Sequence, residues 1–352
     1  MKRPTQKDVA QLAGVSRATV SYVINGLADG QIPISEETRR VVIAAVKELG
    51  YEPDARAQAL RSGNTKTIGL IIPDIHNPHY WDFVDGAEQE ARTSGYHLLL
   101  SATTFNSKYA EDIFDGLAHR RIDGLILCGS FNIQSQKAQN ALTQLLNRQL
   151  PLVEMRDNYN LESDCVVSDY GTPTREVMAY LFSLQHRRIG MVYGTDEPGL
   201  AQDRKAAYEE CLINAGLTLD PNLFVQCGPS IEDGYQAALK LLGIQRRPTA
   251  VIAINDLLAI GVLRAASDLG LKIPEDLSLV GYDNILMSNY LVPRLTTVSK
   301  DAVLAGREAF KFVIERIQNP ALSHRRREIP ARLVIRESTG PNLESINKNT
   351  EL

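Results

Sequence analysis

The sequence predicts an α/β protein in which a small N-terminal helix-turn-helix domain precedes a larger, two-lobed and doubly wound domain. Three observations support this prediction. The chain has 352 residues, which is long for one domain. Its first 50 residues have short helical patterns, and from residue 67 apolar, strand-like runs alternate with helical stretches. No apolar run approaches the roughly 20 residues of a membrane span.

The N-terminal region is expected to form three short helices. Thr5, Ser16 and Ser35 each precede a helical stretch and are suitable N-caps, with Asp8 completing a capping box with Thr5. The first helix is expected to bury Val9, Leu12 and Ala13, and Gly50 to end the third. Gly14 separates the first two helices and tolerates the positive φ of a tight turn.

This arrangement is typical of a DNA-binding helix-turn-helix. Ser16 and Thr19 stand at the start of the second helix, where hydroxyls and free N–H groups favour phosphate. Arg17, Ala18 and Tyr22 are then expected to point outward toward base edges, since Arg pairs with guanine and Ala contacts a thymine methyl. A plain three-helix module that binds protein is the alternative.

The charge distribution agrees with a DNA-binding head. Residues 1–66 carry ten Lys or Arg and seven Asp or Glu, so their net charge is +3. The whole chain has a net charge of −4, so the remaining residues have a net charge of −7. Residues 54–61 are helix-prone but too few to be stable alone, which indicates a linker that folds only when it packs against something. The first residues lack the apolar core of a signal peptide, and the four cysteines are scattered, so we expect a cytoplasmic protein with free thiols.

The remainder of the chain predicts parallel sheets covered by helices on both faces. The clearest strands are TIGLIIP, YHLLLS, DGLILC, LPLVEM, RIGMVYG, TAVIAIN, LSLVGYD and ARLVIRE. The order is duplicated, because IGLIIPD opens one series and IGMVYGT opens a second that begins at Ile189. Two such lobes place a ligand cleft between the carboxyl ends of their strands.

Catalysis is not expected. The sequence has no GxSxG elbow, no phosphate-binding GxxxxGK[ST] loop and no HExxH motif. His76 and His79 have a metal-like spacing, but Pro78 lies between them and no Cys or third His is near. We therefore interpret them as two polar rings on a loop and expect no metal and no cofactor.

The sequence resembles the LacI–GalR family of transcription regulators along nearly its whole length. The matching stretches are DVAQLAGVSRATVSYVIN, SEETR, LGYEPDARAQALR, IGLIIPDIHNP, DGLIL, VSDYG, INDLLAIG, LSLVGYD and PRLTTV. The resemblance implies a periplasmic-binding-protein-like effector domain and a head that binds double-stranded operator DNA. It places Arg17, Ala18 and Tyr22 where family members read the major groove. One departure is the loop of residues 26–34, which is longer than in the family's best-known members.

The resemblance also implies a hinge helix over residues 54–61. Leu60 matches the leucine that is wedged into the minor groove, with Ala57 on the same hinge face, although packing against the core is the alternative for Leu60. The full predicted DNA-binding set is Thr5, Ser16, Arg17, Ala18, Thr19, Ser21, Tyr22, Asn25, Ala57 and Leu60.

For the effector, the resemblance carries Arg204, Asn255 and Asp283 onto family binding positions, where their side chains suit sugar hydroxyls. Tyr80 and Trp81 stand where aromatic residues line the cleft, although either is equally suited to the core. Phe131 is a weaker candidate.

Arg156 matches an aspartate of the lactose-type repressors and, with Arg204, supplies two guanidiniums. This favours an effector with a carboxylate or phosphate. Alternatively, Arg156 pairs with Asp157 or Asp283 and the effector is a neutral sugar.

Together these observations predict four regions: a DNA-binding domain (1–52), a hinge and linker (53–66), an effector-binding and dimerisation domain (67–340) and a tail (341–352). The expected function is that of a homodimeric repressor of a carbohydrate-utilisation operon, controlled by a small sugar-like effector and without a membrane partner. The alternative is a solute-binding protein of the same two-lobed fold with no transcriptional role.

Overall fold

The computed structural model describes residues 4–24, 34–52, 64–104, 107–119, 122–129, 136–155, 163–194 and 202–343. The chain divides into two compact units, Met1–Thr65 and Lys66–Leu352, referred to below as the head and the body. None of the helices in the described ranges is long and apolar enough to span a membrane.

The described part of the head contains α1 (Gln6–Ala13), α2 (Arg17–Ile24) and α3 (Glu36–Leu49). The predicted caps are confirmed. Thr5 and Asp8 form a capping box on α1, and the Thr19 and Thr38 N–H groups donate to Ser16 Oγ and Ser35 Oγ at 3.0 and 3.2 Å. Gly14 ends α1 with φ of 63°, so α2 begins only three residues later in a new direction.

A small apolar core holds the three helices together. It consists of Val9, Ala10, Ala13, Val20, Val23, Val42 and Ala45. The prediction that Leu12 belongs to this core is wrong, because its side chain is 46% exposed. Val9 and Ala13 are one helical turn apart and fill the narrow contact with α2 and α3, so little apolar surface is left to cover Leu12.

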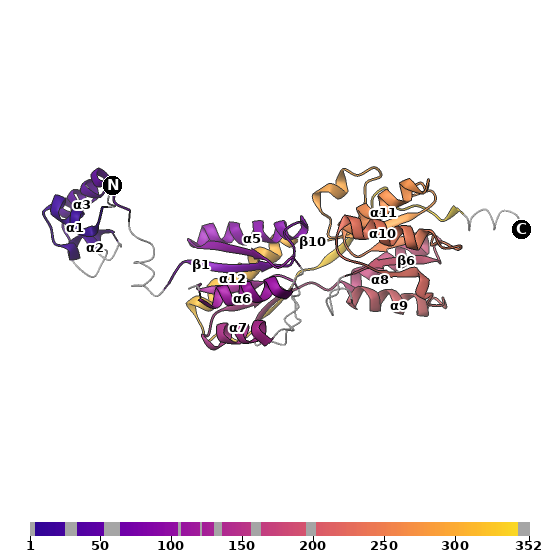
Figure 1. Ribbon diagram of the computed structural model, residues 1–352, viewed down its shortest axis with the longest axis horizontal. Coiled ribbons are helices and arrows are strands. Elements are labelled where there is room, and N and C mark those ends of the chain that lie inside the picture. The colour runs from indigo at the N-terminus through magenta and orange to yellow at the C-terminus, as the bar shows by residue number, and fades with distance from the viewer. Residues whose placement is uncertain are drawn as a thin grey trace, which may run out of the picture. The chain divides into compact units, whose positions relative to one another are not determined.

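The first lobe of the body is a six-stranded sheet in the order β11-β5-β4-β3-β1-β2, parallel throughout. Alternate residues of β1 face opposite sides: Ile68 and Leu70 pack with one helix pair, and Ile71 with the other. Figure 1 shows α5 on one side of β1 and α6 on the other. The elements are β1 (Thr67–Ile72), α5 (His79–Ser94), β2 (His97–Ala102), α6 (Ser107–His119), β3 (Gly124–Leu127), α7 (Gln136–Asn147), β4 (Leu152–Glu154), β5 (Asp164–Val167), α12 (Ala302–Gln318) and β11 (Arg326–Glu328).

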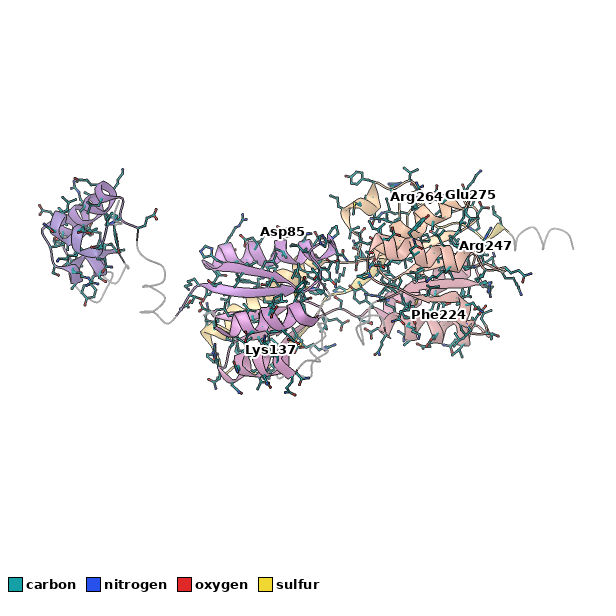
Figure 2. The ribbon with its side chains drawn as sticks, viewed as in Figure 1. Asp85, Lys137, Phe224, Arg247, Arg264 and Glu275 are labelled. Atoms are coloured by element: carbon teal, nitrogen blue, oxygen red, sulfur yellow. The ribbon has the colours of Figure 1, made fainter. Side chains whose placement is uncertain are left out.

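The second lobe repeats this order as β12-β10-β9-β8-β6-β7, with only β12 antiparallel. The duplicated series starting at Ile189 and the two doubly wound sheets are therefore confirmed. The elements are α8 (Gly171–Ser183), β6 (Ile189–Tyr193), α9 (Gln202–Asn214), η1 (Pro221–Leu223), β7 (Phe224–Gln226), α10 (Ile231–Leu242), β8 (Ala250–Ala253), α11 (Asp256–Asp268), β9 (Ser278–Tyr282), η2 (Leu286–Asn289), β10 (Thr296–Lys300) and β12 (Ala331–Val334). Charged side chains such as Arg264 project outward from the helices (Figure 2).

Three connections join the lobes. The chain leaves the first sheet after β5, returns to it after β10 through α12, and leaves it again after β11. On its return, α12 packs closely along α5. A Cβ on Gly306 would lie 2.1 Å from the Phe83 carbonyl oxygen, so only glycine permits this approach. The body thus has two sheets linked at three places, and its strand ends meet at a common pocket.

Candidate functional site

The first turn of α2 presents an exposed polar surface on the head. The side chains of Arg17 and Ala18 are exposed, and those of Thr19 and Tyr22 are partly exposed. Ser16 Oγ lies 2.9 Å from Thr19 Oγ1 and accepts the Thr19 N–H, so the pair caps the helix and retains one hydroxyl hydrogen for an outside acceptor. A helix N-terminus with this composition suits phosphate contacts beside base-reading side chains.

Two other predicted DNA-binding residues, Thr5 and Ser21, differ in exposure. Thr5 is exposed, but its hydroxyl already donates to Asp8 Oδ2 at 2.7 Å. Ser21 is buried in the described part of the head, on α2 between Val20 and Val23, and its role in DNA binding stays a prediction. Asn25, Ala57 and Leu60 lie outside the described residues.

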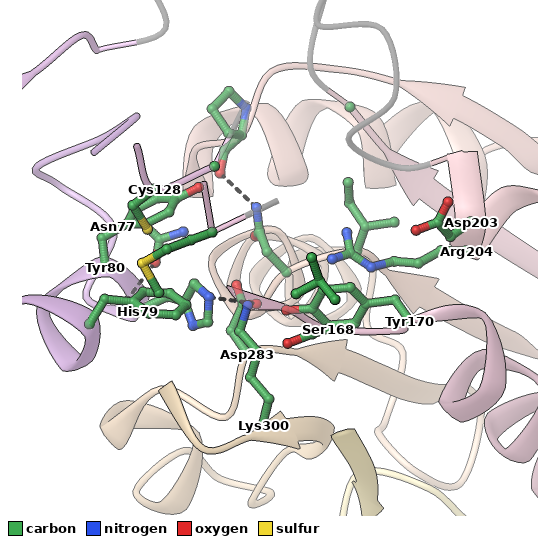
Figure 3. Close-up of a pocket in the computed structure, with 18 of the residues that line it drawn as sticks. Asn77, His79, Tyr80, Cys128, Ser168, Tyr170, Asp203, Arg204, Asp283 and Lys300 are labelled. Atoms are coloured by element: carbon green, nitrogen blue, oxygen red, sulfur yellow. Dashed lines mark hydrogen bonds and ion pairs between the residues drawn. The ribbon is translucent and has the colours of Figure 1, made fainter. Parts of the chain in front are cut away.

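The body contains a pocket of about 260 Å³ at the carboxyl ends of its parallel strands. Both lobes contribute to it, which is the position expected for ligands in open α/β sheets (Figure 3). The first lobe supplies His79 and Tyr80 after β1, and the second supplies Arg204, Asp283 and Lys300. The other lining residues are Asn77, Phe83, Cys128, Gly129, Met155, Val167, Ser168, Tyr170, Gly194, Asp203, Pro229, Ile254, Asn255 and Arg326.

Arg204 is held between aromatic rings. Its guanidinium carbon lies 4.1 Å from the centroid of Tyr170 and 5.0 Å from that of Tyr282. Tyr282 is fixed in turn by a 2.7 Å hydrogen bond between its hydroxyl and that of Thr174, and burial raises its pKa to about 12. The stack directs a buried cation into the pocket in a rigid orientation (Figure 3).

Asp283 and His79 face each other across the pocket. His79 Nε2 lies 3.6 Å from Asp283 Oδ1, which is longer than a hydrogen bond. Burial, reinforced by Lys300 and Arg204, lowers the pKa of His79 well below 6.5, so its ring is neutral and the contact is not an ion pair. Burial raises the pKa of Asp283 to about 6 against the opposing effect of Arg204 and Lys300. Asp283 also has a φ of 99°, a strained conformation of the kind that concentrates at functional sites.

Asp256 holds the segment that follows Asp283. Its buried carboxyl group accepts hydrogen bonds from the Ile285 N–H (3.0 Å), the Ser288 hydroxyl (2.5 Å) and the Thr297 hydroxyl (2.7 Å). Burial, followed by the charge of Asp283, raises the pKa of Asp256 to about 7. Asp256 is thus a positioning residue, which the sequence analysis did not single out.

The predicted effector residues are only partly brought together. Tyr80, Arg204, Asn255 and Asp283 line the pocket, but Trp81 does not and is 43% exposed. Trp81 follows Tyr80 on α5, and the turn of about 100° per residue directs it away. Phe131 and Arg156 lie outside the described residues.

Asn255 lines the pocket and also stabilises the start of α11. Its Oδ1 accepts the Leu258 N–H at 2.7 Å and so caps α11, while Nδ2 donates to the Pro229 carbonyl at 3.3 Å. This leaves mainly one N–H for a ligand.

His79 and Lys300 are the pocket residues that sequence reasoning missed. His79 was interpreted as a polar loop residue, but it is buried, whereas His76 is exposed. The two rings therefore do not converge. Lys300 ends β10, which begins within the PRLTTV stretch, and its place two residues after that stretch was the available signal.

A helix-turn-helix head joined to a two-lobed body with a pocket at its strand ends defines a ligand-controlled DNA-binding protein. The family of bacterial regulatory proteins called lacI matches residues 5–54, and the periplasmic binding protein-like domain matches residues 178–339. The ribose operon repressor of Haemophilus influenzae is 34% identical over 336 residues, covering 95% of this chain and 98% of the relative. The chain belongs to the lacI family of bacterial regulatory proteins.

Solved structures of other proteins support the same family assignment. The lac repressor dimer bound to operator and the anti-inducer ONPF is similar to this chain with a TM-score of 0.84 and 26% identity, over 96% of this chain and 100% of that one. The complex of the transcriptional regulator CelR with cellobiose has a TM-score of 0.70 and 28% identity, over 96% and 100%. The chain is therefore a DNA-binding transcriptional regulator with a small-molecule effector, and the alternative of a solute-binding protein without a transcriptional role is wrong.

Proposed function

We propose that this regulator is a homodimeric repressor of a carbohydrate-utilisation operon, and that its effector binds in the pocket that contains Arg204 and Asp283. The observation that carries the proposal is that both lobes supply polar side chains to one pocket at their strand ends. The ribose and cellobiose named for similar proteins support a carbohydrate as the type of effector.

The coupling between effector and DNA follows from the three connections between the lobes. A ligand that contacts His79 from one lobe and Asp283 from the other favours one relative orientation of the two sheets. The ligand can change the affinity for DNA only to the extent that it binds one orientation more tightly than the other. By the same linkage, operator DNA changes the affinity for the ligand by an equal factor.

An apolar surface on the second lobe supports the homodimer. Four large side chains within residues 286–292 are exposed: Leu286, Met287, Tyr290 and Val292, the last two by 78% and 90%. Contiguous exposed apolar groups of this kind mark association sites. A second copy of the chain is the occupant that a two-fold symmetric operator requires, since each head reads one half-site.

The test of DNA recognition uses the full chain and a pool of random duplexes. Sequences retained by the chain are expected to contain two similar half-sites in inverted orientation. Arg17→Ala should change the preferred bases at one position of each half-site, because Arg17 is exposed on the first turn of α2. Arg264→Ala, on the exposed surface of the second lobe, is the matched control and should leave the selected sequence unchanged.

Equal weakening of all sequences by Arg17→Ala would remove Arg17 from base recognition. A variant without residues 1–62 separates the two activities: it should lose DNA retardation and keep small-molecule binding. Retention of operator binding by this variant would contradict the proposed division between head and body.

A further inference from the structure

The pocket holds a cation, Lys300, that forms no ion pair with any described residue, although its charge acts on Asp283. Lys300 is partly buried at the end of β10, and its ammonium nitrogen lies 4.7 Å from the ring centroid of Phe83 and 5.0 Å from that of Tyr170. Within the described ranges, its side chain makes neither a hydrogen bond nor an ion pair. An ammonium group has three donors, and a ligand that expels water must supply acceptors for them.

The net charge of the inner pocket is positive. Lys300 and Arg204 are both cationic, whereas His79 is neutral and Asp283 is the one carboxylate on the inner lining as far as the structure describes it. With Asp283 ionised, this leaves one positive charge. Asp203 and Arg326 are exposed and offset each other. A ligand with one negative charge therefore balances the inner pocket, whereas a phosphate ester with nearly two charges exceeds it.

The Asp283 carboxylate is an acceptor on the lining that accepts no hydrogen bond among the described residues. Buried acceptors of this kind are costly until they are satisfied, and ligand hydroxyls satisfy them. The rings of Tyr80, Phe83 and Tyr170 add apolar faces suited to the C–H surface of a sugar.

We propose that the effector is a sugar acid, a polyhydroxylated molecule with a single carboxylate that pairs with Lys300 and whose hydroxyls donate to Asp283. This inference rests on the proposed function, since it takes the same pocket as the effector site. Arg204, fixed against Tyr170, provides the second positive group near the carboxylate.

The test is calorimetric titration of the full chain with matched pairs of compounds. The acids are D-gluconate, D-glucuronate, D-galacturonate and D-ribonate; the neutral counterparts are D-glucose, D-galactose and D-ribose; glucose 6-phosphate represents the dianion. At least one acid should bind about tenfold or more tightly than its neutral counterpart, which lacks the charge-assisted contact. It should also bind more tightly than the phosphate, whose second negative charge the inner pocket does not balance.

Variants assign that difference to Lys300. Lys300→Met keeps the apolar stem and should weaken the acid about 10- to 100-fold while changing neutral sugars less than about twofold. Lys300→Arg should restore much of the affinity. Lys240→Met, exposed on α10, is the matched control and should have no effect. Unchanged thermal unfolding of each variant shows that the pocket is intact.

The proposal is overturned if a neutral sugar or the phosphate binds most tightly, if none of the acids binds, or if Lys300→Met weakens acid and neutral compounds equally. DNA retardation by the same preparation keeps the two proposals distinct. Acid binding without retardation of any duplex would contradict the regulatory function alone, whereas retardation relieved only by a neutral sugar would contradict the sugar acid alone.

Discussion

Replacing Asp256 with asparagine tests whether burial in the second lobe controls the ionisation of this carboxyl group. The group is fully buried, and its pKa is raised from 3.8 to about 7. Between these values the folded protein keeps a proton that the unfolded chain has lost. The contribution of Asp256 to stability is therefore fully present below pH 3.8 and is lost as the pH rises through 7.

The magnitude follows from the two pKa values. Their difference corresponds to about 4 kcal/mol, of which about 3 kcal/mol falls between pH 5 and pH 8. Asparagine does not titrate, and its amide still accepts the Ile285 N–H. The wild-type chain should therefore lose about 3 kcal/mol of unfolding free energy relative to Asp256→Asn over this range, since the other titrating groups are common to both proteins.

The measurement is urea-induced unfolding of both proteins at pH 5, 6, 7 and 8, followed by circular dichroism. Asp268→Asn, at the other end of α11, is the matched control. Asp268 is partly exposed and paired with Arg264, so its replacement should cost less than about 1 kcal/mol. A wild-type minus Asp256→Asn difference that stays constant or rises with pH would refute the reasoning.

Three further predictions concern other parts of the chain. Gly14→Ala should destabilise the head by about 1 to 2 kcal/mol in thermal unfolding, because φ is 63° and the space around it is open, so backbone strain acts alone; no change would contradict this. Asp164→Asn should cost about 3 kcal/mol in urea unfolding, because the buried carboxylate pairs with Arg316 and Arg325; a loss under 1 kcal/mol would show that the arginines find other partners. Tyr290→Asp should shift sedimentation of the full chain from dimer to monomer, and an unchanged dimer would place the interface elsewhere.

The sequence predicts strands best where burial on both faces produces continuous apolar runs. TIGLIIP and TAVIAIN became β1 and β8 for this reason. By contrast, β11 consists of Arg326, Arg327 and Glu328, all exposed, and exists because β5 offers it an edge to pair with. Such a strand forms because it pairs with a neighbouring strand, and the local sequence pattern does not predict it.

The sequence predicted where along the chain the pocket residues lie, but it did not predict which way their side chains point. The resemblance pointed to Arg204 and Asp283, and both line the pocket: Asp283 directly follows β9, and Arg204 lies in the first turn of α9. It could not show that Tyr80 faces inward while Trp81 faces out, or that Lys300 lies between two rings. These depend on the rotation of α5 and the twist of β10, which packing determines.

The return of the chain to the first lobe constrains how the protein is made. Strands β1–β5 are synthesised by residue 167, but the helix that covers one face of their sheet, α12, comes at Ala302–Gln318, and the strand that closes its edge comes later still. During translation the first half therefore emerges with only α5 on one face of its sheet, and the part of that face that α12 covers, along β3, β4 and β5, is still open. A nascent chain that stalls before residue 302 presents this face to chaperones and proteases. The first lobe thus acquires its last helix and its edge strand only after most of the second lobe has been synthesised.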